Sequence, residues 1–264
     1  MKLSQSQIDE YEGNGFLFFP SLLTQPEMAL ISSELATIAS KPRREIVYEK
    51  DGKTLRSIFN MHTYNEAFAR LVRHPKIIEP VRQLLNEPIY LFQIILNFKA
   101  AFGGDDWPWH QDYPTYHFDD GMPEPKLVNT LIFVDEVNEF NGPLMLIPGS
   151  HKCDLPLPDI NTTMTSYPAR WLPPKTFERI ARENGIVAPK GPPGSIIFAH
   201  TNIIHGSVKN MSPWGRSLIS LTLNSVKNAT RGSRRPDYIV PNDRTPLEPL
   251  GEHCLDELMH RSVA

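Results

Sequence analysis

The chain has little of what disulfide-rich, membrane-spanning or nucleic-acid-binding proteins require. Two cysteines, Cys153 and Cys254, are too few for a disulfide framework or a cysteine-rich zinc site. The apolar run over 16–19 is far shorter than the roughly 18 residues that cross a bilayer. A net charge of −3 favours neither a nucleic-acid backbone nor an anionic membrane as partner. Because no signal-peptide core follows Met1, we expect a cytoplasmic protein, with monomer and homodimer both open.

Proline, by contrast, is abundant, and the apolar pattern changes along the chain. The 264 residues include 25 prolines, which favours many short elements with rigid turns over a helix bundle. Helical spacing after Thr24 and over 75–86 predicts a helical N-terminal part over about 1–88, containing an extended pair over 42–60. From residue 89 the pattern predicts β-structure, with candidate strands over 89–98, 127–135, 143–147, 194–200 and 216–226.

The last of these strands alternates most clearly. Ile219, Leu221 and Leu223 share one face, and mostly polar residues share the other, which would form a site wall inside a barrel. We predict loops over 152–173 and 228–250, with a short helix over 174–184 between the first loop and the next strand. One domain over 1–264 follows, mostly β with flanking α-helices: a β-core over about 89–226 and a C-terminal tail over 227–264. Whether the two loops form a lid stays open.

Two His-x-Asp triplets are candidate metal ligands. On an extended segment residues i and i+2 point to the same side, so His110 and Asp112 can bind adjacent positions on a metal. A second imidazole would complete the 2-His-1-carboxylate arrangement of non-haem Fe(II) oxygenases. The bulky segment 107–109 before His110 suits a shaped pocket, whereas the triplet over 117–119 runs into what resembles a loop tip.

Two histidines are candidates for the distal ligand. His200 ends the strand over 194–200 and His205 follows soon after it, and spacing alone does not choose between them. Arg216 starts the next strand. A guanidinium at the mouth of a barrel strand suits bidentate binding of a carboxylate, with a solvated strand-end arginine as the alternative.

The segments 101–112, 140–151 and 204–207 resemble the phytanoyl-CoA dioxygenase superfamily. The opening over 8–17 and the helix after Thr24 are also similar. The resemblance implies Fe(II)- and 2-oxoglutarate-dependent oxygenase activity, using O2, on a double-stranded β-helix (jelly roll, cupin-like) core.

The resemblance also implies roles for single residues. It implies that His110, Asp112 and His205 are the iron ligands and therefore the catalytic residues. It implies that 2-oxoglutarate is held by Arg216, Ser207 and Lys99, with Asn97 a weaker candidate. Gln93 matches a glutamine that faces the substrate in ectoine hydroxylases. For the substrate we also predict apolar walls from Tyr113, Tyr116 and Trp107. Candidate carboxylate anchors are Arg56 and Arg235, with ordinary surface arginines as the alternative.

The activity that this resemblance implies is hydroxylation of an unactivated C–H of a small zwitterionic amino acid, with release of succinate and CO2. Similarity to hydroxylases of aliphatic L-amino acids, such as leucine hydroxylase, covers 101–105, 109–112 and 245–247. Over 113–116 the chain departs from ectoine hydroxylases, so ectoine and imino acids rank second as candidate substrates, after aliphatic amino acids. Other secondary metabolites rank third. A zinc enzyme of the cupin type and a non-catalytic β-sandwich binding module are remote alternatives.

Overall fold

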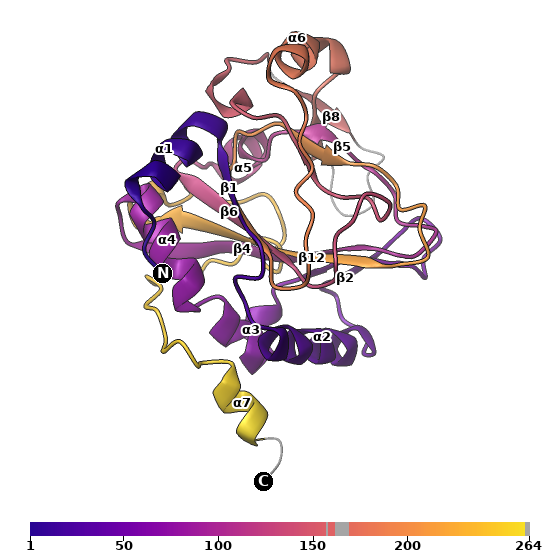
Figure 1. Cartoon of the computed structure of the whole chain (residues 1–264), viewed down its shortest axis with the longest axis vertical. Coiled ribbons are helices and arrows are strands. Elements are labelled where there is room, and N and C mark those ends of the chain that lie inside the picture. The colour runs from indigo at the N-terminus through magenta and orange to yellow at the C-terminus, as the bar shows by residue number, and fades with distance from the viewer. Residues whose placement is uncertain (157, 162–168, 262–264) are drawn as a thin grey trace.

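Two antiparallel β-sheets form the centre of the computed structural model, which describes residues 1–156, 158–161 and 169–261 (Figure 1). The larger sheet has the order β1-β10-β6-β12-β4-β3-β2 and the smaller sheet the order β5-β11-β7. The larger sheet comprises β1 (Phe16–Phe19), β2 (Ile46–Tyr48), β3 (Leu55–Phe59), β4 (Ile89–Lys99), β6 (Leu127–Phe133), β10 (Ile196–His200) and β12 (Arg216–Ser225). The smaller comprises β5 (Trp107–His110), β7 (Met145–Leu146) and β11 (His205–Ser207). Residues of both sheets line one cavity, as the predicted double-stranded β-helix requires.

Helices lie against the sheets and at the ends of the chain. The α-helices are α1 (Gln5–Asn14), α2 (Gln25–Ala39), α3 (Glu66–Leu71), α4 (Pro75–Leu85), α5 (Tyr113–Asp120), α6 (Pro174–Asn184) and α7 (Asp256–Arg261). Short 3-10 helices are η1 (Met61–Thr63), η2 (Ser150–Lys152) and η3 (Val226–Asn228). The helices predicted after Thr24, over 75–86 and over 174–184 are confirmed. Within the described residues no helix is both long and apolar enough to cross a membrane.

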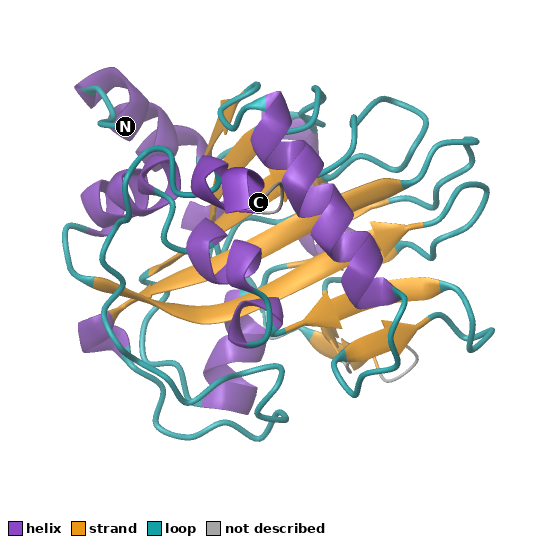
Figure 2. Ribbon diagram, turned by 90° about the horizontal axis from the view of Figure 1, so that it is seen from below, coloured by secondary structure: helices purple, strands orange, loops and turns teal. Residues whose placement is uncertain are grey.

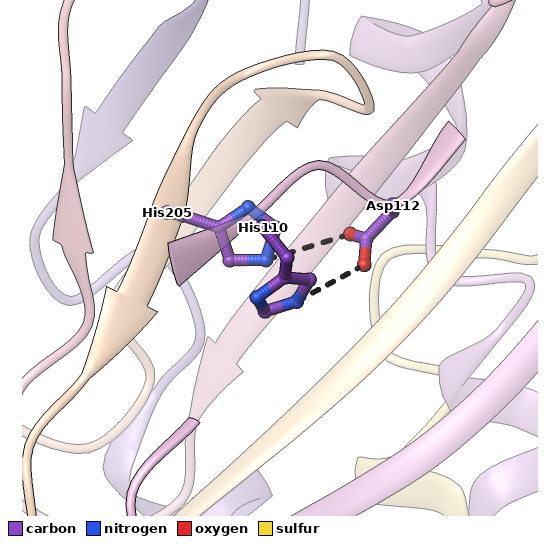
Figure 3. A group of neighbouring side chains, drawn as sticks. All are labelled: His110, Asp112 and His205. Carbon is purple, nitrogen blue, oxygen red and sulfur yellow. Dashed lines mark ion pairs between the residues drawn. The ribbon is translucent and has the colours of Figure 1, made fainter. Parts of the chain in front are cut away.

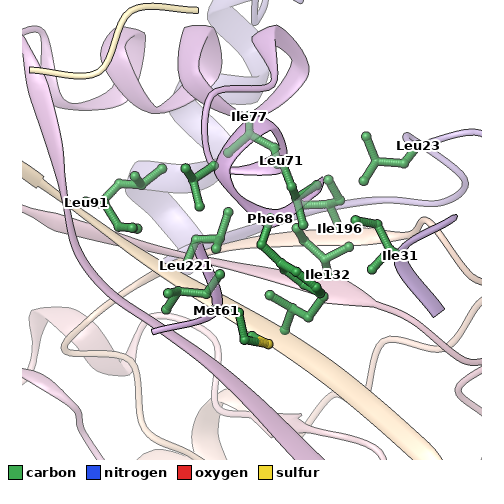
Figure 4. Packing of buried hydrophobic residues seen from close by; sticks show 14 of the residues in the cluster. Leu23, Ile31, Met61, Phe68, Leu71, Ile77, Leu91, Ile132, Ile196 and Leu221 are labelled. Atoms are coloured by element: carbon green, nitrogen blue, oxygen red, sulfur yellow. The ribbon is translucent and has the colours of Figure 1, made fainter. Parts of the chain in front are cut away.

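The main core lies between the larger sheet and the helices on its outer face (Figures 2 and 4). Ile219, Leu221 and Leu223 of β12 pack there with residues of α2, α3 and α4, as their alternation predicted. Each fully buried Leu or Ile stabilises the fold by about 1.5–3 kcal/mol. The opposite face of β12 carries Arg216 and Ser220, which border the cavity. The predicted site wall is therefore present, although both faces of this strand are buried.

Three sequence expectations need correction. The segment 16–19 is strand β1 and not helix, because it pairs with β10 at the edge of the larger sheet. The predicted loop over 152–173 contains the paired strands β8 (Asp159–Asn161) and β9 (Ala169–Trp171); positions 157 and 162–168 lie outside the described residues. The C-terminal tail contains α7, which packs near α2. Short elements of this kind depend on partners distant in the sequence, so local periodicity does not reveal them.

Candidate metal centre and adjoining cavity

The pairing of two short strands brings two histidines together. His110 ends β5 and His205 begins β11, and the two residues are directly opposite each other in the antiparallel register. Their ring centroids are 4.2 Å apart. Gly206 allows this approach, because a Cβ there would lie 2.9 Å from the carbonyl oxygen of Trp107. The smaller sheet therefore sets the spacing of the two imidazoles.

Asp112 completes the group from the start of α5 (Figure 3). Its Oδ1 lies 3.5 Å from His110 Nε2, and its Oδ2 lies 3.6 Å from His205 Nε2. Asp112 has αR backbone dihedrals at the N-cap of α5, so the expectation that one extended segment carries both residues is wrong for the aspartate. Among the described residues, no other cluster of three or more His, Cys, Asp or Glu is close enough to hold a metal ion.

Hydrogen bonds to backbone carbonyls orient both imidazoles. His110 Nδ1 lies 2.6 Å from the Pro108 oxygen, and His205 Nδ1 lies 3.0 Å from the Ile203 oxygen. A carbonyl only accepts, so each Nδ1 carries a proton and each Nε2 offers a lone pair to the centre of the group. Two imidazole nitrogens and a carboxylate are the ligands that iron takes in non-haem oxygenases. The arrangement thus fits an Fe(II) ion.

The three side chains shift one another's pKa values. Burial would raise the pKa of Asp112, but the neighbouring imidazoles of His205 and His110, together with the hydrogen bond that Asn129 donates, lower it to about 2. Burial, followed by the neighbouring His110, lowers the pKa of His205 to about 4. Burial opposes the shift at His110, yet Asp112 raises the pKa of that imidazole. A carboxylate held ionised beside a neutral imidazole is ready to bind a cation.

A cavity of about 140 Å³ lies between the two sheets and contains all three of these side chains in its wall. The apolar part of its wall consists of Phe59, Ile95, Trp107, Tyr116, Leu131, Leu144, Leu218 and Ile239. The polar part comprises Gln93, Asn97, Thr115, Ser207, Arg216, Ser220 and Arg235. The structure therefore brings together most of the predicted site residues.

Arg216 is the most deeply buried of the cationic residues that border the cavity. Its side chain is only 2% exposed and donates from Nη2 to the Gly142 carbonyl, at 2.7 Å. Its Nε has no hydrogen-bond partner among the described residues. Gly142 has a φ of +72°, and a Cβ there would come within 2.9 Å of Lys99 Cδ. A buried guanidinium with an unsatisfied donor fits the carboxylate of a bound acid such as 2-oxoglutarate.

Lys99 and Arg56 lie beside this region but not in the cavity wall. Lys99 is directly opposite Arg216 in the β4–β12 pair, and its Nζ donates to the Asp105 carbonyl at 2.6 Å. Burial, then the charges of Arg216 and Arg56, lower the pKa of Lys99 to about 7. Arg56 binds both carboxylate oxygens of Glu49 at 3.1 Å, and its guanidinium lies 4.2 Å from the ring centroid of Trp107. Arg56 is thus a buried, paired residue and not a surface arginine.

Arg235 and Tyr116 lie at another part of the cavity. Arg235 is paired with the fully buried Asp120, and its guanidinium lies 5.4 Å from the centroid of the Tyr116 ring. Gln93 donates to the Ile239 carbonyl, at 3.1 Å. Tyr113 does not border the cavity: its hydroxyl donates to the Pro123 carbonyl, at 2.8 Å. Direct contact between Tyr113 and a substrate therefore finds no support in this placement.

The remaining histidine candidates lie elsewhere. His117 is in α5, where its Nδ1 lies 2.8 Å from the Met122 oxygen, and Asp119 pairs with Arg170 at 3.4 Å. His200 ends β10, and its Nδ1 accepts from the backbone of Asn202. The structure thus resolves the choice that spacing left open: His205, and not His200, lies beside the His110 triplet.

Asn129 is a site residue that the sequence did not reveal. Its Nδ2 donates to Asp112 Oδ2, and it lies in the middle of β6, where the surrounding residues are uniformly buried. A polar residue inside an apolar run is the signal that could have drawn attention to it, because a buried amide needs partners.

Comparison with known proteins agrees with this site. Residues 11–218 match the family model for phytanoyl-CoA dioxygenase (PhyH). An L-proline trans-4-hydroxylase from Streptomyces griseoviridis is 33% identical over 256 residues, covering 91% of this chain and 93% of the relative. An ectoine dioxygenase from Bordetella bronchiseptica is 32% identical over 253 residues, covering 90% and 82%. EctD from S. alaskensis, in a crystal structure with 2-oxoglutarate and 5-hydroxyectoine, has a TM-score of 0.83 and 29% identity, covering 94% of this chain and 87% of its own.

The family match covers well over half of the chain and includes all three metal-site residues. The relatives are a hydroxylase and dioxygenases, and the match to this chain covers most of their length. The alternatives of a zinc enzyme and of a binding module therefore no longer stand. With a His-Asp-His group that fits iron and a buried arginine that fits a carboxylate, the chain belongs to the phytanoyl-CoA dioxygenase (PhyH) family and is an Fe(II)- and 2-oxoglutarate-dependent dioxygenase.

Proposed function

We propose that the protein hydroxylates an aliphatic C–H bond of a small, free, zwitterionic amino or imino acid. The observation that carries this proposal is one cavity bordered by the His110–Asp112–His205 group, by Arg216 and by Arg235. One small cavity thus combines a metal site, a carboxylate site for the co-substrate at Arg216, and a second arginine, Arg235, beside apolar walls.

The charge of the cavity favours a substrate with no net charge. Arg235 is paired with Asp120, so this part of the wall carries no net charge and does not demand an anionic substrate. Leu131, Leu144 and Leu218 offer an apolar surface to a hydrocarbon side chain or ring. An acyl-CoA, with its several phosphates, suits such a cavity poorly.

Within this class we propose two candidate groups. Imino acids and ectoine are supported by the relatives, an L-proline trans-4-hydroxylase and ectoine dioxygenases. Aliphatic L-amino acids such as leucine are supported by the apolar walls and by the departure from ectoine hydroxylases over 113–116, where Thr115 and Tyr116 border the cavity. The relatives give leucine no preference over proline, so the two groups stand equal.

In this proposal the protein binds and orients the reactants. His110, Asp112 and His205 would hold Fe(II), and Arg216 with Ser207 would hold the distal carboxylate of 2-oxoglutarate, with Lys99 close by. Fe(II) with bound 2-oxoglutarate and O2 supplies the oxidising chemistry, in which one oxygen atom enters succinate as CO2 leaves and the other enters the product.

The test is a substrate panel. The apoprotein is reconstituted without oxygen with Fe(II) and 2-oxoglutarate, then exposed to air with L-proline, ectoine or L-leucine. We expect one of them to raise succinate formation and to yield stoichiometric product heavier by one oxygen atom, about 16 mass units. The Asp112→Gly variant is the control. No increase with any zwitterion, together with turnover of an acyl-CoA, would overturn the proposal.

A further inference from the structure

A line of three buried polar side chains, Asn129, Thr222 and Tyr116, runs from Asp112 through the sheet and returns to the cavity wall at Tyr116. Asn129 Nδ2 donates to Asp112 Oδ2, Thr222 Oγ1 donates to Asn129 Oδ1 at 2.8 Å, and the Tyr116 hydroxyl lies 3.4 Å from Thr222 Oγ1. Asn129 and Thr222 are opposite each other in the β6–β12 register, so the sheet itself places the two side chains together. Tyr116 borders the cavity and Asn129 does not.

The chemistry of each group fixes the direction of this chain. The Asn129 carbonyl can only accept, so the single hydroxyl proton of Thr222 points to it. Thr222 then has only lone pairs left for Tyr116, and the Tyr116 hydroxyl must be the donor. Every bond therefore points from Tyr116 toward Asp112, and the amide of Asn129 is held with its NH2 group against the carboxylate.

The burial of these groups gives the chain its strength. Thr222 is fully buried, and Asn129 and Tyr116 are 4% and 5% exposed. Water therefore does not compete for these donors and acceptors, and a rotated Asn129 would set its oxygen against the Asp112 carboxylate. Such an orientation is costly, so the amide has one stable position.

We infer that Asn129 is a positioning residue for the metal ligand Asp112, and that Thr222 and Tyr116 hold Asn129 in its orientation. The Asn129 amide fixes the rotation of the carboxylate relative to His110 and His205. This role concerns the ligand group alone and does not depend on which substrate the enzyme takes.

The test measures metal affinity, which needs neither turnover nor substrate. Fe(II) is titrated without oxygen into purified wild type, Asn129→Leu and Thr222→Val, and the charge-transfer absorption of the Fe(II)–2-oxoglutarate complex is recorded for each. We expect Asn129→Leu to lose about 10- to 100-fold in Fe(II) affinity, the range typical of residues that orient metal ligands. Thr222→Val should lose less, and Thr222→Ser, which keeps the hydroxyl, should recover most of that loss.

Thr130→Val is the matched control. Thr130 is next to Asn129 in β6 and as fully buried as Thr222, but its hydroxyl has no hydrogen-bond partner among the described residues. This variant should bind Fe(II) like wild type. Unchanged affinity and absorption in folded Asn129→Leu and Thr222→Val would overturn the inference, as would an equal loss in Thr130→Val. If Asn129→Leu fails to fold, Thr222→Val and Thr222→Ser decide alone.

Discussion

Asp112 and Asp119 occupy equivalent places in two His-x-Asp triplets, yet their surroundings differ. Asp112 faces two imidazoles and accepts a hydrogen bond from Asn129, and these neighbours lower its pKa to about 2 although burial opposes the shift. Asp119 faces Arg170 outside the cavity, at 3.4 Å. Identical local sequence patterns thus serve a metal site in one case and an ion pair in the other.

We therefore expect Asp112→Gly to abolish hydroxylation, and Asp119→Gly to retain it. The first change removes a ligand, whereas the second lowers helix propensity at the end of α5 by only about 0.3 kcal/mol. Succinate formation and Fe(II) binding of both variants, measured below their melting temperatures, check this. Full activity of Asp112→Gly would disprove the ligand assignment.

Arg216 should matter for the co-substrate and not for iron. Arg216→Leu removes a buried guanidinium that we assign to the distal carboxylate, and charge-assisted hydrogen bonds contribute about 1.5–3 kcal/mol each. We expect the Kd of 2-oxoglutarate to rise on the order of 100-fold with Fe(II) affinity nearly unchanged. Arg179→Leu, on the exposed surface of α6, is the control for loss of an arginine. Equal 2-oxoglutarate affinity in both variants would contradict the assignment.

At the scale of elements, one buried pair joins the starts of two helices on the outer face of the larger sheet. Thr24 caps α2, and the Glu27 carboxylate accepts a hydrogen bond from the Thr24 backbone N–H, at 2.7 Å. The other oxygen of Glu27 lies 2.9 Å from His74 Nε2, and His74 Nδ1 accepts from the Lys76 backbone at the start of α4. Because Nδ1 accepts, Nε2 carries the proton and donates to Glu27. Each helix therefore fixes the position of the other.

This pair predicts how stability depends on acid. Burial would raise the pKa of Glu27, but hydrogen bonds from His74 and Thr24 lower it from its ordinary value of 4.5 to about 2. The ionised carboxylate therefore stabilises the fold fully above about pH 4.5, and this stabilisation is lost as the pH falls toward 2. We expect Glu27→Gln to be less stable by about 1–3 kcal/mol at pH 7 and to lose less on acidification.

Urea unfolding between pH 7 and pH 3 measures both effects. Glu178→Gln, on the exposed surface of α6, should change neither the stability nor its pH dependence appreciably. A parallel fall of stability with pH in wild type and Glu27→Gln would contradict the prediction.

At the scale of the whole molecule, the cavity belongs to neither sheet alone. Gln93 and Arg216 reach it from the larger sheet, His110 and Ser207 reach it from the smaller, and Tyr116 comes from α5. A ligand that bridges these elements binds the folded chain and not the unfolded one, so it should stabilise the whole fold.

We expect Fe(II) with 2-oxoglutarate, each at about 100 times its Kd, to raise the melting temperature by about 5–10 °C under anaerobic conditions. A chelator should reverse the shift, because the triad would no longer hold the metal. Asp112→Gly should show little or none of it. A shift of the same size in that variant would place the stabilising metal somewhere else.

The longer elements could be predicted from sequence, and the shorter ones could not. The capping box at Thr24 and the alternation in 216–226 act through neighbours in the chain, so both α2 and β12 were predicted close to their bounds. Strands β5 and β11 have four and three residues and carry too little pattern to recognise. Their existence depends on pairing with each other, and that pairing is what places His110 opposite His205.

The sequence by itself determined the residue types of the site and the order of the main elements, because motifs and periodicities are local. It led to His110, Asp112 and Arg216, and left the distal histidine open until a family resemblance was considered. The tertiary structure places His205, and not His200, beside the triplet, and it alone shows that Asn129 donates to Asp112 and that Arg56 is buried against Glu49. Some of these residues are about a hundred positions apart in the sequence, as His110 and His205 are. Burial and strand register bring them together, and no local sequence pattern encodes either.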